Sequence, residues 1–168
     1  QTLFLEQSKS WISEVQVKAP WIKAVHVEYP ARQIALADKL FTHVHEHCAP
    51  NNRHLCNPDL LISIPEPIDP ITTWKIIMID APTGYDDRQP GRMAAMYSAA
   101  KYITDKLLFG EDNSIDVFVH DCDREIEDKW SSSLFCSYNM IASEGRMRRY
   151  RITTEHVSAA VKRNTSCQ

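Results

Sequence analysis

The sequence predicts an α/β domain built on a mostly parallel sheet. Two apolar, β-branched runs, over 75–80 and 115–120, are typical of buried parallel strands, and helix-period segments alternate with them. The first run ends in Asp80, and Asp121 directly follows the second. The carboxyl ends of parallel strands meet at one edge, where open α/β sheets bind ligands. We therefore expect Asp80 and Asp121 to share one site.

Composition excludes several classes of protein. The chain has 168 residues, of which 43% are hydrophobic, so it can bury a sizeable core. A net charge of −3 and a pI near 6.2 give no electrostatic basis for binding nucleic acid. No apolar run is long enough to span a bilayer. The four glycines lie in turns, and none forms the glycine-rich turn that nucleotide-binding α/β domains place after an early strand.

The first half of the chain predicts alternating strands and helices. In order, we expect a strand over 2–6, a helix over 11–17, a strand over 21–28, a helix over 33–47 and a short strand or turn over 60–64. Ser8 or Ser10 is a candidate cap for the first helix. Prolines 65, 67 and 70 then predict an extended connection.

The second half continues the alternation and closes with a hairpin. We expect a strand over 75–80, a helix over 92–108, a strand over 115–120, a helix over 125–135, and strands over 138–142 and 147–152 around a turn at 143–146. This is the layout of the Rossmann-like sheet of S-adenosylmethionine-dependent methyltransferases, with its antiparallel C-terminal hairpin. The prediction is one domain over 1–168, with 156–168 as a flexible tail.

Acids at two strand ends are the first candidates for chemistry. Glu6 ends the first predicted strand, where an acid can hydrogen-bond the ribose hydroxyls of a nucleotide cofactor; the alternative is an exposed acid that begins a loop. Asp80 precedes Ala-Pro and can bind a divalent cation, contact the cofactor or act as a general base. Its alternative is to cap the following loop.

A third strand end gathers more polar groups. His120, Asp121 and Asp123 follow the strand over 115–120, and we predict catalytic roles for Asp80, His120 and Asp121. Oxygen ligands from Asp80, Asp121 and Asp123 would suit Mg²⁺ or Mn²⁺. Alternatively, Asp121 pairs with Arg124, or Asp123 caps the helix that begins there.

The loop after Asp80 offers candidate substrate contacts. Tyr85, Arg88 and Arg92 lie in or beside it, and the planar fork of arginine suits a carboxylate. The alternative is a solvated helix N-terminus, although the helix dipole disfavours cations there. The arginines at 146, 148, 149 and 151 are interpreted as a solvated edge that discourages strand pairing.

Histidine and cysteine pairs are weaker signals. His43, His45 and His47 precede Cys48, but only His43 and His47 share a helix face, so we do not expect a structural zinc. Cys48 and Cys56 bracket a polar loop where a disulfide would be useful, and composition alone does not decide whether it forms.

Longer motifs resemble one known family. The segments are IIMIDAPTGYDDRQPGRMAAMYSAA, DVFVHDCDREIEDKWSSSLFC and EGRMRRYRI, with TLFLEQSKSWI and VEYPARQIALADKLF before them. Together they resemble the plant polysaccharide-biosynthesis proteins typified by glucuronoxylan 4-O-methyltransferases. The likeness covers nearly the whole chain.

The resemblance implies an activity and a location. It implies an enzyme of the Golgi lumen, held by a membrane anchor absent from this chain, that transfers a methyl group from S-adenosylmethionine to glucuronic acid on xylan. Some relatives modify arabinogalactan, and a divalent cation is implied for some members. Glu6 corresponds to the ribose-binding acid, Asp80, His120 and Asp121 to the site-lining strand ends, and Arg92 to the PGRM turn.

Departures from the family pattern leave alternatives open. The family's glycine-rich strand and turn, central in its sheet, have no counterpart here, so we expect a chain truncated at its N-terminus that binds the cofactor weakly. Arg88-Gln89 replaces the usual acidic-plus-alanine pair, which affects substrate choice. The alternatives are a non-catalytic xylan-biosynthesis scaffold or polysaccharide-binding relative, and a metal-dependent hydrolase that uses the aspartates.

Overall fold

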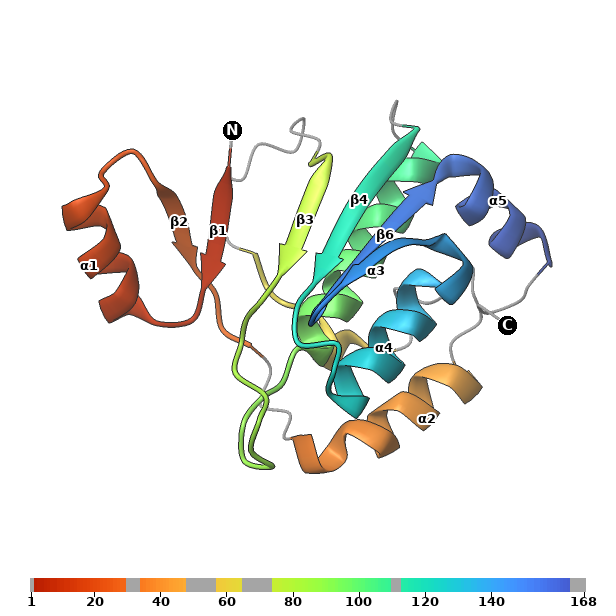
Figure 1. Ribbon diagram of the computed structural model, residues 1–168, viewed down its shortest axis with the longest axis horizontal. Coiled ribbons are helices and arrows are strands. Elements are labelled where there is room, and N and C mark those ends of the chain that lie inside the picture. The colour runs from red at the N-terminus through yellow and green to blue at the C-terminus, as the bar shows by residue number, and fades with distance from the viewer. Residues whose placement is uncertain (1, 30–33, 48–56, 65–73, 110–112, 164–168) are drawn as a thin grey trace.

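The structure is a computed structural model that describes residues 2–29, 34–47, 57–64, 74–109 and 113–163 (Figure 1). Its strands are β1 Leu3–Glu6, β2 Lys23–His26, β3 Ile76–Ile79, β4 Ser114–Val119, β5 Met140–Glu144 and β6 Met147–Thr153. Its α-helices are α1 Lys9–Lys18, α2 Ala37–His47, α3 Met93–Phe109, α4 Glu125–Phe135 and α5 Thr154–Arg163. Short 3-10 turns form η1 Ile34–Leu36, η2 Pro58–Leu60 and η3 Ser137–Asn139.

The described strands form two sheets. β1 and β2 pair in parallel, and the second sheet has the order β3-β4-β6-β5. β3 and β4 are parallel, whereas β6 is antiparallel to both β4 and β5. Figure 1 shows β1 to β4 with their arrowheads toward the same end of the molecule. A mixed α/β fold is therefore confirmed, while the finer Rossmann-like arrangement stays a prediction.

One face of the four-stranded sheet makes the core. Along β4, Ile115, Val117 and Val119 are fully buried, while the residues between them are partly exposed, as the two-residue period of a strand requires. The buried residues join those of α3 and α4 in one cluster. Trp130 of α4 packs edge-on against Phe41 of α2, with ring centroids 5.5 Å apart.

Most predicted elements are observed, and the C-terminal tail differs. The helix predicted over 125–135 coincides with α4, and the hairpin turns at Gly145, whose φ is 53°. The flexible tail predicted from His156 is wrong for residues 156–163, because α5 occupies them and buries Val157 in the core. Of the short strand or turn predicted over 60–64, the structure has the turn, η2 at Pro58–Leu60, with Leu60 buried.

The cysteines and histidines of the weaker signals are largely outside the described residues. Cys48 and Cys56 lie there, and the side chains of His45 and His47 are not described either. Cys122 is a free, buried thiol, and Cys136 is disulfide-bonded. Within the described ranges, no helix combines the length and apolar character needed to cross a membrane.

Candidate functional site

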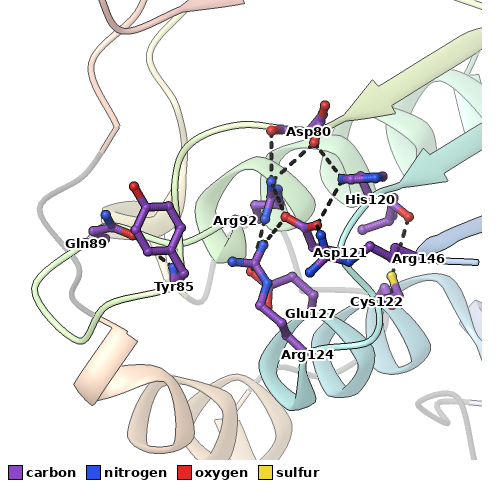
Figure 2. Close-up of polar contacts among 12 residues, drawn as sticks. Asp80, Tyr85, Gln89, Arg92, His120, Asp121, Cys122, Arg124, Glu127 and Arg146 are labelled. Atoms are coloured by element: carbon purple, nitrogen blue, oxygen red, sulfur yellow. Dashed lines mark hydrogen bonds and ion pairs between the residues drawn. The ribbon is translucent and has the colours of Figure 1, made fainter.

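The polar residues that follow the parallel strands β3 and β4 lie close together (Figure 2). Asp80 follows β3, and His120 and Asp121 follow β4. His120 Nδ1 lies 3.0 Å from Asp80 Oδ1 and 3.1 Å from Asp121 Oδ1. These are ion-pair distances, and neither contact has hydrogen-bond geometry. The prediction that Asp80 and Asp121 meet at one sheet edge is confirmed; their catalytic roles stay predictions.

Arg92 contacts both Asp80 and Asp121. Its Nη2 donates to the Asp80 main-chain oxygen at 2.9 Å and lies 2.8 Å from Asp121 Oδ2. The residue is only 4% exposed, and its Nη1 lies 3.4 Å from Glu127 Oε1. The guanidinium that was predicted to grip substrate is thus buried among protein acceptors. In this structure Arg92 positions the acids.

Asp121 is surrounded by positive charge. Arg124 contacts the same Oδ2 as Arg92, and Arg146 Nη1 lies 3.4 Å from Oδ1. The Asp121 backbone has φ 61°, in the left-handed region that few residues with a side chain adopt. Such conformations persist where surrounding contacts determine them, and they are concentrated at functional sites.

Glu127 is a member of the cluster that the sequence interpretation missed. It is fully buried, and its Oε1 lies 3.3 Å from Arg124 Nη2 as well as 3.4 Å from Arg92. Burial raises the pKa of the Glu127 carboxyl, and the charge of Arg92 opposes that rise. The available signal was spacing: positions 127, 130, 131 and 134 make the buried face of α4, and only 127 carries a charge.

The cluster is layered from solvent to core. The Asp80 side chain is 61% exposed, His120 33% and Asp121 14%. Glu127 is 1% exposed at the other end of the series. Solvent therefore reaches Asp80 and His120 directly, whereas Asp121 lies behind them.

Asp123 lies outside this cluster. Its Oδ2 accepts a hydrogen bond from Arg146 Nε at 2.9 Å. The predicted helix cap is wrong, because α4 has Arg124 at its N-cap position with no side-chain cap hydrogen bond. The alternative pairing of Asp121 with Arg124 is observed.

The described residues offer one group of potential metal ligands: Asp80, His120 and Asp121, with ligand atoms within 4.8 Å of one another. Mixed carboxylate and imidazole donors suit transition metals. However, Arg92 and Arg124 already contact Asp121 Oδ2, and Arg92 Nη2 lies 3.3 Å from Asp80 Oδ1. Guanidinium groups so close repel a divalent cation. The residues therefore fit a cation poorly, and we derive no catalytic step through one.

The loop between Asp80 and Arg92 presents the other predicted substrate residues. Gly91 N–H donates to the Thr83 carbonyl at 3.0 Å, which closes the base of the loop. At its tip Tyr85 is 77% exposed, while Tyr85 N–H donates to Gln89 Oε1 at 2.9 Å.

Arg88 lies on the outside of the same loop. Its Nε and Nη2 donate to the two Asp86 oxygens at 3.0 and 2.9 Å, and the Arg88 side chain is 87% exposed. Tyr85 and Arg88 are thus exposed on the loop and available to a ligand.

Glu6 is the last residue of β1, and the arrowhead of β1 points toward the same end of the molecule as that of β3, which Asp80 follows (Figure 1). Glu6 Oε1 accepts the Ser8 N–H at 2.7 Å, and the Glu6 carbonyl accepts the Val27 N–H at 2.9 Å. Burial, reinforced by the Glu6 charge, raises the pKa of Tyr29 to about 12. Glu6 therefore has a fixed, partly buried carboxylate beside a phenol that stays protonated.

Comparison with known proteins identifies the family of this chain. Residues 1–150 match the model of the family described as IRX15/IRX15L/GXM. The chain belongs to this family. The matched part includes every residue of the acid and arginine cluster.

Relatives within the family carry several names. Glucuronoxylan 4-O-methyltransferase 1 of Arabidopsis thaliana is 37% identical over 156 residues, which cover 89% of this chain and 52% of the relative. Arabinogalactan O-methyltransferase 2 of the same plant is 33% identical, over 90% of this chain and 53% of that protein. Protein IRX15-LIKE is 26% identical, over 89% and 48%. The chain thus spans about half the length of these relatives. No solved structure matches it.

Proposed function

We propose that the natural protein is an S-adenosylmethionine-dependent O-methyltransferase that acts on glucuronic acid side chains of a cell-wall polysaccharide, glucuronoxylan first, in the Golgi lumen. The observation that carries the proposal is the convergence of Asp80, His120 and Asp121 at the carboxyl ends of β3 and β4. The names of the relatives support the reaction, and the resemblance of the motifs implies the compartment.

Methyl transfer requires an aligned acceptor oxygen and a group that removes its proton. Asp80 is the best placed base, since its carboxylate is the most exposed of the three. Asp80 would accept the hydrogen bond of the acceptor hydroxyl and take the proton that this oxygen releases, while bound S-adenosylmethionine would supply the methyl group and leave as S-adenosylhomocysteine. His120 and Asp121 lie behind Asp80 and restrict where that carboxylate can point.

The acceptor sugar is an anion, which matches the loop beyond Asp80. Arg88 can pair with a uronic carboxylate because its guanidinium is exposed on the loop. Tyr85 offers an exposed ring on which the apolar face of a sugar can pack. Arg92, which is buried, would hold Asp80 and Asp121 in place through its contacts with both.

We assign binding of the cofactor S-adenosylmethionine to Glu6, with Asp80 as a second contact. A fixed carboxylate at a parallel strand end fits the paired hydroxyls of a ribose. S-adenosylmethionine, when bound, supplies an electrophilic methyl group on sulfur. Glu6 would orient the nucleoside, and Asp80 would hold the acceptor against it.

A non-catalytic role in xylan biosynthesis is the second candidate. The observation that favours it is the extensive ion pairing of the cluster, because Asp121 is engaged by guanidinium groups on both oxygens. A protein with this role would bind polysaccharide and leave S-adenosylmethionine untouched.

Product analysis tests the proposal. The natural protein at its full length is incubated with S-adenosylmethionine and glucuronoxylan, and with xylan stripped of glucuronic acid as the control polymer. We expect a methyl ether on glucuronic acid in the first polymer and none in the second. Cleaved glycan would support the hydrolase, and absence of product together with no S-adenosylmethionine binding in calorimetry would support the non-catalytic role.

A further inference from the structure

We propose that Glu127 is a positioning residue for the proposed methyl transfer: its buried carboxylate holds Arg92 and Arg124, and these two arginines hold Asp121 beside His120. The inference rests on the proposed function for its kinetic consequence. The arrangement of these side chains does not depend on that function.

Shared partners are the first argument. Glu127 Oε1 lies 3.4 Å from Arg92 Nη1 and 3.3 Å from Arg124 Nη2. The same two guanidinium groups contact a single oxygen, Oδ2, of Asp121 (Figure 2). The two acids therefore share one pair of arginines, and Oδ1 of Asp121 lies 3.1 Å from His120 Nδ1.

The arginines have few other restraints. The Nε atoms of Arg92 and Arg124 are both buried and have no hydrogen-bond partner in the described part of the chain. Arg92 is also held by the Asp80 oxygens, whereas Arg124 pairs with only these two acids among the residues that the structure describes. Removing the Glu127 charge would take one carboxylate from the buried Arg92 guanidinium and from the partly buried Arg124 guanidinium, and a buried charge that loses its partner is costly.

Glu127 itself has little freedom to move. It lies on the face of α4 that buries Trp130 and Ser131, at a position fully excluded from solvent. A Cβ atom on Gly84 would lie 3.0 Å from Glu127 Oε1, so the loop after Asp80 packs directly on the carboxylate. One buried side chain thus joins the loop after β3, the start of α3 and the end of β4.

Kinetics of the natural protein at its full length distinguish positioning from general stabilisation. We expect Glu127→Gln to lower kcat for glucuronoxylan about 10- to 100-fold with little change in KM, the size expected for a displaced catalytic group. Glu127→Asp, which keeps the charge, should recover part of the loss. Asp128→Asn is the matched control, because its carboxylate is on the same helix but pairs with Arg148 and Ser132, and its kcat should stay within about twofold.

A double-mutant cycle identifies the route of the effect. In an Asp121→Asn background, Glu127→Gln should have little further effect on kcat, because residues that act through one another are not additive. Full additivity of the two losses, or a loss confined to thermal stability at unchanged kcat, would overturn the inference.

A structural readout keeps this inference separate from the proposed function. If the parent protein transfers no methyl group, the proposed function fails, and crystal structures of the parent and of Glu127→Gln still test the positioning. We expect the Asp121 carboxylate to leave its 3.1 Å contact with His120 in the variant. An unmoved carboxylate would overturn the inference; if Glu127→Gln does not fold, Glu127→Asp is judged by the same contact.

Discussion

Asp121 combines an uncommon backbone conformation with contacts on both carboxylate oxygens. Its φ of 61° turns the chain sharply after β4 and brings the side chain back toward the strand ends. Asparagine tolerates this conformation better than most residues. Asp121→Asn therefore removes the charge with the least disturbance of the fold, which makes it the most informative change at this position.

Tyr85 tests whether the exposed loop binds polysaccharide. Because Tyr85 is 77% exposed, Tyr85→Ala should leave the melting temperature nearly unchanged. Loss of sugar packing should raise KM for glucuronoxylan roughly three- to tenfold. Tyr138→Ala, which removes another exposed ring that contacts His156 away from the site, is the control. Equal KM values for the parent protein and Tyr85→Ala would contradict a binding role.

The ion pairs of Asp116 should make the free energy of unfolding depend on pH. A side-chain hydrogen bond from Arg151, supported by Arg149, holds the pKa of the Asp116 carboxyl below its usual value. The ionised group thus stabilises the fold above the pKa of the unfolded chain, and this contribution is lost as pH falls through the lower pKa of the folded state.

Asp116→Asn should lower the free energy of unfolding at pH 7 by about 1 kcal/mol. The difference from the parent should shrink as pH falls below about 4, where the carboxyl begins to protonate in the unfolded chain. Denaturant unfolding at several pH values measures both quantities. A difference of equal size at pH 3 and pH 7 would contradict the prediction.

Among the elements, α4 shows what sequence patterning can and cannot predict. Its bounds, Glu125–Phe135, follow from the apolar period and coincide with the prediction. The role of Glu127 was not found, because a charged residue on an apolar face is identified only by asking which partner buries it. Those partners, Arg92 and Arg124, come from the starts of two different helices.

Gly91 closes the loop that carries Tyr85, and it has two reasons to be glycine. Its φ is 66°, and an added Cβ would lie 2.5 Å from Ile34 Cδ1. Gly91→Ala should therefore cost about 2–3 kcal/mol of unfolding free energy, the sum of backbone strain and forced repacking.

A substitution at Gly145 measures the cost of backbone strain without the cost of repacking. Gly145 also has a positive φ, 53°, but nothing lies within 4 Å of its added Cβ. Gly145→Ala should cost only the backbone term, about 1–2 kcal/mol. Denaturant unfolding of both variants measures the difference, and equal losses would show that Ile34 adapts without cost.

For the molecule as a whole, the topology could be predicted further than the site. Strand ends at Asp80 and Asp121 were expected to converge because parallel strands share an edge, and they do. The burial of Arg92 was not foreseen, since neither spacing nor composition says which side chain a helix start turns toward the core. The polar residues of α5 predict a tail, because sequence alone does not show that Val157 packs in the core.

The central proposal is that the acids at the ends of β3 and β4 form the catalytic centre of a glucuronic acid O-methyltransferase, and it is supported by the names of relatives and by the meeting of these acids at one sheet edge. The chain spans about half the length of its relatives, so the claim concerns the natural protein at full length.

Turnover of Asp80→Asn and Asp121→Asn tests that claim most directly. Methyl transfer from S-adenosylmethionine to glucuronoxylan is measured for both variants and for the parent protein, with folding checked by circular dichroism. We predict that each variant loses at least about 100-fold in kcat, the contribution of a positioned acid–base group. Unchanged turnover in both folded variants would contradict the account.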